Sequence, residues 1–129
     1  MSLLLDTHAV HWWTAERERV SERATEAIRA ADEVLVADIT WLELAWLVRA
    51  DRIRIAVPVR SWLEQIASGV RTIGITPAIA AAAASLPASF PKDPADRLIY
   101  ATAIETGSRL VTKDGRLRRH RHPGVTIVW

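Results

Sequence analysis

The stretch Ser2-Leu3-Leu4-Leu5-Asp6 joins a short apolar run to an acidic residue at its end. An apolar run of this length, bounded by a polar residue, is typical of a buried strand. Similar runs occur at 34–37, 72–75, 110–113 and 125–128, and stretches with helical character separate them. Because strands that alternate with helices form parallel sheets covered on both faces, the chain is predicted to be α/β. We expect three layers around a central, mostly parallel sheet of four to five strands.

The expected helices combine apolar faces with capping residues at their ends. They span 7–15, 21–31, 39–50, 58–67, 77–86 and 95–106, and Gly107 is a typical C-terminal cap of the last one. No internal repeat, low-complexity segment or linker interrupts the 129 residues. The chain is therefore expected to form one domain over 1–129.

Composition excludes several classes of function. The chain has no cysteine, so disulfides, zinc thiolates and thiol catalysis are excluded. No apolar run approaches the ~20 residues of a membrane span, and no basic segment precedes the apolar run at 3–5 as in a signal peptide. We therefore expect a cytoplasmic protein without a membrane partner.

The positive charge is unevenly distributed. Net charge is only +2, yet the pI is about 9.7 and residues 113–122 form a dense basic block. Such a block can contact a phosphate backbone or an acidic partner, or it can be a solvated helix face and loop.

Four carboxylates are predicted to converge. Asp6 and Asp114 each follow a strand, and Asp96 opens a helix that leads into the strand at 110–113. Ligands of open α/β sheets bind at the carboxyl ends of the strands, so these three acids should share one edge. Glu43 is the only charge in an apolar helical stretch and has no lysine or arginine three or four residues away. A buried carboxylate without a partner is costly, so Glu43 is expected either to face solvent or to meet a cation.

Each acid also has a purely structural interpretation. Asp6 could cap the following helix, and Asp93 and Asp96 suit the first turn of a helix in any protein. Asp114-Gly115 is an ordinary turn dipeptide. Thr112, two residues before Asp114 on the same side of a strand, could hydrogen-bond a metal ligand or be a polar strand end. If the acids do meet, all-oxygen ligation suits Mg²⁺ or Mn²⁺.

Four segments together resemble PIN-domain ribonucleases of the VapC toxin type. They are Leu3-Leu4-Leu5-Asp6-Thr7-His8, Val36-Ala37-Asp38-Ile39-Thr40-Trp41-Leu42-Glu43, Asp93-Pro94-Ala95-Asp96-Arg97-Leu98-Ile99 and Leu110-Val111-Thr112-Lys113-Asp114. The resemblance covers essentially the whole chain, in order and spacing. It implies a PIN-like domain and a toxin of a type II toxin–antitoxin system that cleaves RNA internally with Mg²⁺ or Mn²⁺. It also implies a cognate VapB-like antitoxin and a homodimer.

The resemblance carries the family's acidic site onto Asp6, Glu43, Asp96 and Asp114. Asp6, Asp96 and Asp114 would bind metal, with Thr112 in support and Asp93 nearby. Side chains that could contact RNA are the basic ones near these acids: Arg97, Lys113, Arg116, Arg118 and Arg119.

Three alternatives stay open. An aspartate-nucleophile phosphatase commonly has a second acid two residues after the first, where this chain has His8. A response-regulator receiver needs adjacent acids after the first strand, and none is evident. A catalytically weak PIN module could bind RNA or an antitoxin only.

The chain also has six tryptophans, which either belong to the core or form a partner surface.

Overall fold

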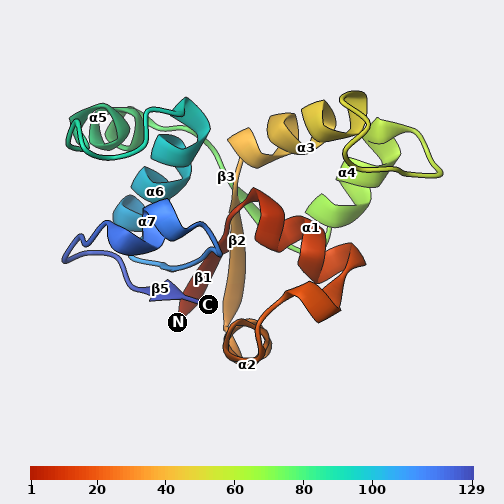
Figure 1. Cartoon of the computed structure of the whole chain (residues 1–129), viewed down its shortest axis with the longest axis horizontal. Helices are drawn as coiled ribbons and strands as arrows, with labels where there is room; N and C mark the ends of the chain where they lie inside the picture. Colours follow the sequence, from red (N-terminus) through yellow and green to blue (C-terminus); the bar gives the residue numbers. More distant parts are fainter.

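The centre of the protein is a five-stranded sheet in which every pair of neighbouring strands is parallel (Figure 1). The computed structural model describes residues 1–129. The strands follow the order β3-β2-β1-β4-β5. They are β1 (Ser2–Leu5), β2 (Glu33–Ala37), β3 (Arg71–Ile73), β4 (Arg109–Val111) and β5 (Ile127–Val128). The expectation of an α/β fold on a parallel sheet is confirmed.

Strand β1 lies in the middle of the sheet and sets the register of its neighbours. Leu4 of β1 is level with Leu35 of β2 and Leu110 of β4, and all three are buried. The chain adds β2 and β3 on one side of β1, then crosses over to add β4 and β5 on the other. The order therefore switches between β1 and β4, where open α/β sheets bind their ligands.

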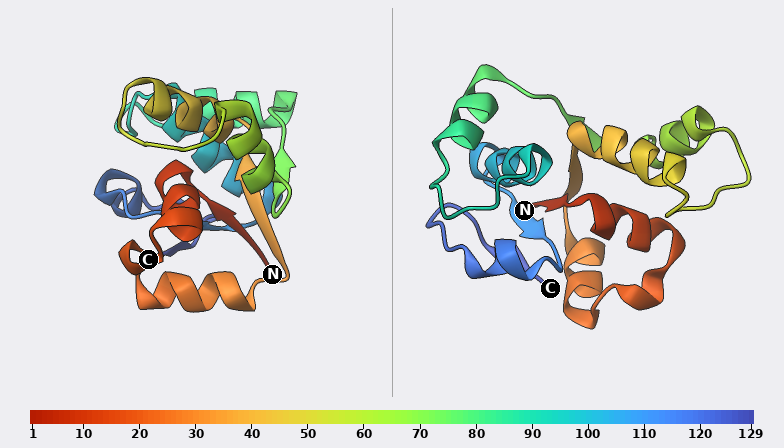
Figure 2. Two further views of the ribbon diagram at one scale, coloured as in Figure 1. Left: turned by 90° about the vertical axis from the view of Figure 1, so that its right-hand side faces the viewer. Right: turned by 45° about the horizontal axis from the view of Figure 1, so that its top comes forward.

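The helices cover both faces of the sheet. They are α1 (Thr7–Ala15), α2 (Glu22–Ala30), α3 (Ile39–Arg49), α4 (Val59–Ala67), α5 (Pro77–Ser85), α6 (Pro94–Thr106) and α7 (Gly115–Arg119), with a 3₁₀ turn η1 (Arg17–Arg19). Figures 1 and 2 show α5, α6 and α7 on one side of the sheet and α1 to α4 on the other. No helix is both long and apolar enough to cross a membrane.

The alternation of side chains along β1 explains the two cores. Leu3 and Leu5 point to one face, where they pack with residues of α1, α2 and α3, while Leu4 points to the other. There it packs with Ile99 and Tyr100 of α6. Because both faces are buried, β1 has no polar residue between Leu3 and Leu5.

The predicted helices are all present, but the strands and the basic block differ in detail. The runs expected at 72–75, 110–113 and 125–128 are shorter strands, so Thr112 and Lys113 lie just beyond β4. The middle of the basic block forms the short helix α7, and one interpretation of the block was a solvated helix face and loop. Leu117, which is fully buried, anchors this helix to the α6 side of the sheet.

Candidate active site

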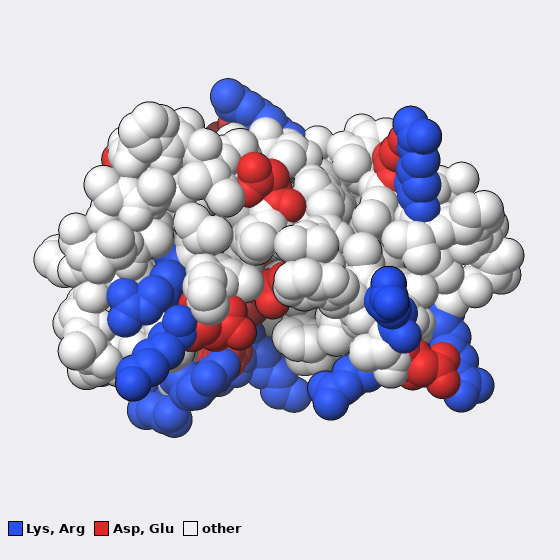
Figure 3. Space-filling view, turned by 90° about the horizontal axis from the view of Figure 1, so that it is seen from above, with Lys and Arg blue, Asp and Glu red and all other residues white.

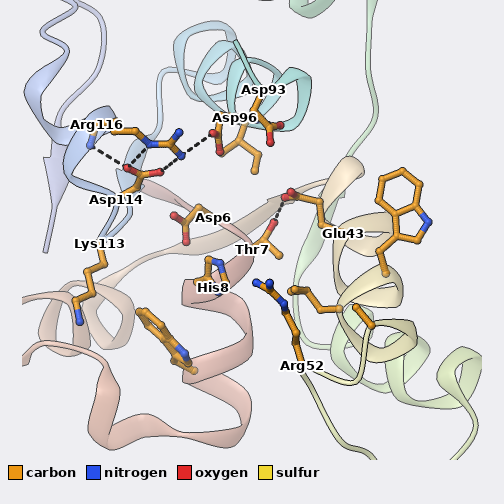
Figure 4. A pocket seen from close by; sticks show the side chains of 15 residues that line it. Asp6, Thr7, His8, Glu43, Arg52, Asp93, Asp96, Lys113, Asp114 and Arg116 are labelled. Carbon is orange, nitrogen blue, oxygen red and sulfur yellow. Dashed lines mark hydrogen bonds and ion pairs between the residues drawn. The ribbon is translucent and has the colours of Figure 1, made fainter. Parts of the chain in front are cut away.

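A cavity of about 790 Å³ opens at the carboxyl edge of the sheet, between α1, α3, α6 and the start of α7. Figure 4 shows its labelled side chains arriving from these separate elements. The lining residues are Asp6, Thr7, His8, Trp12, Glu43, Trp46, Leu47, Ala50, Arg52, Asp93, Asp96, Ile99, Lys113, Asp114 and Arg116. The structure thus brings all four predicted acids and Asp93 to one cavity.

Asp6 has both of the roles considered for it. It follows β1 directly and caps α1, since its Oδ1 accepts a hydrogen bond of 2.9 Å from the Ala9 backbone N–H. Only 8% of it is exposed. Burial raises the pKa of the Asp6 carboxyl, and hydrogen bonds from the Thr112 hydroxyl and the Ala9 N–H oppose that rise. The cap holds this carboxylate in a fixed orientation at the floor of the cavity.

Glu43 reaches the cavity from α3. Its Oε1 accepts a hydrogen bond from the Thr7 hydroxyl (Figure 4), and that hydroxyl also lies 3.1 Å from the Thr40 hydroxyl. No lysine or arginine forms an ion pair with Glu43. The sequence therefore predicted correctly that no lysine or arginine pairs with Glu43, but it missed the hydrogen bond from Thr7, whose only signal was its place directly after Asp6.

The start of α6 supplies two more acids. Asp93 is the N-cap, with its Oδ1 accepting from the backbone N–H of Ala95 at 2.8 Å and of Asp96 at 3.4 Å. Burial and the negative charge of Asp93 raise the pKa of Asp96 to about 6, although Arg116 opposes the rise. The capping interpretation thus holds for Asp93, while Asp96 points its carboxylate toward Arg116.

Asp114 caps α7 and is bound to an arginine. Its Oδ1 accepts from the Arg116 backbone N–H at 2.8 Å. Arg116 Nη2 then donates to Asp114 Oδ2 at 2.8 Å and to Asp96 Oδ2 at 3.3 Å, so one guanidinium bridges the two acids (Figure 4). This hydrogen bonding lowers the pKa of Asp114 and raises that of Arg116.

Thr112 and Lys113 flank these acids. Thr112 is completely buried, and its Oγ1 accepts a hydrogen bond of 3.0 Å from the Asp114 backbone N–H. Thr112 therefore supports Asp114 and Asp6 rather than lying free at a strand end. Lys113 lines the cavity with its Nζ 5.5 Å from the centre of the Trp12 ring.

The acids share a cavity without forming a compact cluster. No group of three or more aspartate, glutamate or histidine side chains is arranged to hold a metal ion. Instead, Arg116 lies between Asp96 and Asp114, while Thr7 holds Glu43. In this arrangement the positive charge among the acids comes from the protein itself.

The structure corrects the role predicted for Arg97. Its guanidinium, expected to contact RNA, donates to backbone carbonyls in the last turn of α5 and in the segment that leads from α5 to α6. The acceptors are the carbonyls of Ala83, Leu86, Pro87, Phe90 and Pro91. These bonds occupy its donors, so Arg97 holds a loop. Arg118 is exposed and does not line this cavity. A second, smaller hollow lies beside the cavity; Arg119 lines it and Arg118 does not.

Comparison with known proteins identifies the family. The family model described as "PIN domain" matches residues 3–123. The chain belongs to the PIN-domain family. It is 62% identical over 128 residues to Ribonuclease VapC22 of Mycobacterium tuberculosis, a match that covers 99% of this chain and 98% of that PIN protein. The resemblance found in the sequence is therefore confirmed.

Solved structures share the PIN fold at low identity. DNA-bound VapBC from Salmonella typhimurium superposes with a TM-score of 0.73 at 19% identity, covering 98% of this chain and 96% of that one. A toxin–antitoxin complex from Klebsiella pneumoniae gives a TM-score of 0.69 at 22% identity, covering 96% and 95%. At such identities the likeness supports the fold alone.

Proposed function

We propose that this PIN-domain protein is an endoribonuclease toxin that hydrolyses RNA phosphodiester bonds with Mg²⁺ or Mn²⁺. The observation that carries the proposal is the convergence of Asp6, Glu43, Asp96 and Asp114 in one cavity, beside Lys113 and Arg116. Acids suit a hard cation, and the neighbouring bases suit a phosphate. The name of the 62% identical relative, a ribonuclease, agrees with this chemistry.

The chemistry of the donors suits a divalent ion, although the carboxylates are not close enough together to hold one in this arrangement. The donors are carboxylate oxygens, which Mg²⁺ and Mn²⁺ prefer. The raised pKa values of Asp6 and Asp96 reflect acids that burial and neighbouring charge make unfavourable to ionise, a penalty that a bound cation removes. Asp6, Asp96 and Asp114 would hold the ion, with Glu43 completing the site directly or through water. A bound ion supplies Lewis-acid charge that activates an attacking water and offsets charge on the phosphate.

The other side chains position these groups. Thr112 fixes the backbone of Asp114, the Ala9 N–H fixes Asp6, and Thr7 fixes Glu43. Carboxylates fixed in this way would keep a bound cation in place while charge develops on the phosphate. Attack by water in line with the leaving oxygen would give a 5′-phosphate and a 3′-hydroxyl. No pair of histidines is needed to activate the RNA 2′-hydroxyl.

The proposal includes an antitoxin partner and a homodimer. Proteins with this fold occur in structures described as toxin–antitoxin complexes, and VapC22 carries the name of such a toxin type. Helix α3 exposes Leu42 and Trp46, at 44% and 60% of their surface. Trp46 also lines the cavity, and exposed large apolar side chains next to a functional cavity favour a protein partner, here a VapB-like antitoxin.

The Asp6→Asn variant tests the catalytic proposal. Asparagine caps a helix as well as aspartate does, so α1 should stay intact while one carboxylate is lost. We expect RNA cleavage with Mg²⁺ to fall by at least about a hundredfold, as for loss of a key transition-state interaction, and EDTA to abolish wild-type cleavage. Cleavage is measured with end-labelled RNA, and the product ends are checked for a 5′-phosphate.

The control is Asp51→Asn. Asp51 is exposed, lies outside the cavity, and has a positive φ of 60° that asparagine tolerates well. It should cleave RNA like the wild type. Full activity of Asp6→Asn, or wild-type cleavage that persists in EDTA, would contradict the proposal.

A further inference from the structure

A second hollow of about 400 Å³ lies beside the acidic cavity. It is lined by Ser89, Pro91, Arg116, Arg119 and His120. Two of these side chains are guanidinium groups and none is acidic, so the hollow is suited to an anion. Figure 3 shows lysine and arginine side chains gathered around the carboxylates on this side of the molecule.

Arg119 has no partner within the protein. It forms no ion pair and its side chain makes no hydrogen bond, in contrast to Arg116. Its guanidinium folds back over the start of α7, where a side chain at Gly115 would place a Cβ only 3.2 Å from Arg119 Nη1. Gly115 therefore leaves room for this guanidinium on the same turn as Arg116, although the two charges repel each other.

The wall of the hollow is fixed by aromatic packing. The His120 ring makes edge-on contacts with Phe90 and Tyr100, at 4.9 and 5.4 Å between ring centres. Phe90 and Tyr100 are almost completely buried. His120 is therefore held by the core, which fixes this wall of the hollow.

Arg116 connects the hollow to the acidic cavity because it lines both. An RNA strand with its scissile phosphate over the carboxylates can therefore pass Arg116 and place another phosphate in the second hollow. We propose that this hollow is the subsite for the backbone phosphate next to the scissile one, bound by Arg119 and Arg116. The inference rests on the proposed ribonuclease function, and it adds the path that the RNA strand takes across the protein surface.

The test compares two arginines of the same segment. Arg119→Ala removes the subsite, whereas Arg121→Ala removes an equal charge from an exposed position that lines neither hollow. Both are made in the Asp6→Asn protein, so that bound RNA stays intact. Binding of a short, fluorescein-labelled single-stranded RNA of randomised sequence is followed by anisotropy over a series of salt concentrations.

We expect Arg119→Ala to raise the Kd about tenfold, as for one charge-assisted hydrogen-bonded contact. The slope of log K against log salt should fall in magnitude by about 0.7, as for one phosphate contact on a single strand. Arg121→Ala should stay within about twofold, because an exposed charge that lines neither hollow is largely screened by salt. Equal effects of the two substitutions would overturn the subsite, since the segment would then act only through its net charge.

A neutral phosphate makes the assignment specific. The wild-type protein first shows at which position it cuts. Cleavage of an RNA with one uncharged methylphosphonate next to that position is then measured for the wild type and for Arg119→Ala and Arg121→Ala, each made without Asp6→Asn. Arg119→Ala should be impaired on normal RNA but match the wild type on the neutral RNA. If the wild-type protein cleaves no RNA, the proposed function is wrong. If the wild type cleaves RNA but Arg119→Ala is impaired equally on the normal and the neutral RNA, only the subsite is wrong. The same holds if Arg119→Ala is impaired only in antitoxin binding.

Discussion

Asp96 is the acid whose surroundings disfavour its charge most clearly. Its pKa is raised to about 6, first by burial and then by Asp93. Folding therefore favours its protonated form, which stabilises the fold at low pH, and this contribution is lost as the pH rises through about 6. At neutral pH the ionised carboxylate of the metal-free protein destabilises the fold.

Asp96→Asn should therefore stabilise the metal-free protein at high pH. We expect the free energy of unfolding to rise by about 1 kcal/mol near pH 8, after allowing for solvent screening, and by about half as much near pH 5, because the penalty builds up between the ordinary pKa of 3.8 and the raised pKa of about 6. Urea denaturation in EDTA at both pH values measures the difference, with Asp51→Asn as the control. If the variant is less stable than the wild type near pH 8, the ionised Asp96 carboxylate does not destabilise the fold.

Arg97 acts at the scale of an element, by holding the segment between α5 and α6. Its guanidinium donates to five backbone carbonyls over distances of 3.0 to 3.4 Å. The segment leads directly into Asp93, the cap of α6, so the clamp also positions the acids of that helix. A planar guanidinium with five N–H donors can satisfy such a set, whereas an ammonium cannot.

Arg97→Lys should therefore destabilise the protein despite keeping the charge. We expect a loss of about 2 kcal/mol in the free energy of unfolding, since several bonds to a charged donor disappear together. Urea denaturation measures it, and Arg23→Lys on the exposed face of α2 should have no effect. Unchanged stability would mean that the carbonyls are solvated equally well without the guanidinium.

Elements and acids were predictable from the sequence to different degrees. Apolar runs such as Leu3 to Leu5 and caps such as Ser21 are local signals, and the structure has the strand and helix they predict. The different roles of Arg97 and Arg116 could not be predicted from local signals, since both are arginines close to an acid in the sequence. Only the packed structure shows that one clamps a loop while the other bridges two helix starts.

At the scale of the whole molecule, the site exists only when distant segments are assembled. Asp6 follows β1, Asp114 follows β4, and Glu43 and Asp96 come from helices on opposite faces of the sheet. A cation that needs several of these carboxylates binds the folded state and not the unfolded one. Binding must then stabilise the fold by mass action, and the size of the effect reports the affinity.

Arg116 should weaken that affinity, because its guanidinium already bonds both oxygens of Asp114 and one of Asp96. An incoming Mn²⁺ must displace this positive charge or bind beside it, and either is unfavourable. Near pH 8, we expect Mn²⁺ to raise the Tm of Arg116→Ala at several-fold lower concentration than for the wild type, while Arg121→Ala responds like the wild type. A Mn²⁺ response that is unchanged or weaker in Arg116→Ala would mean that the guanidinium and the ion do not compete. The arginine would then serve only to fix the two carboxylates, and its release would not be part of loading the site.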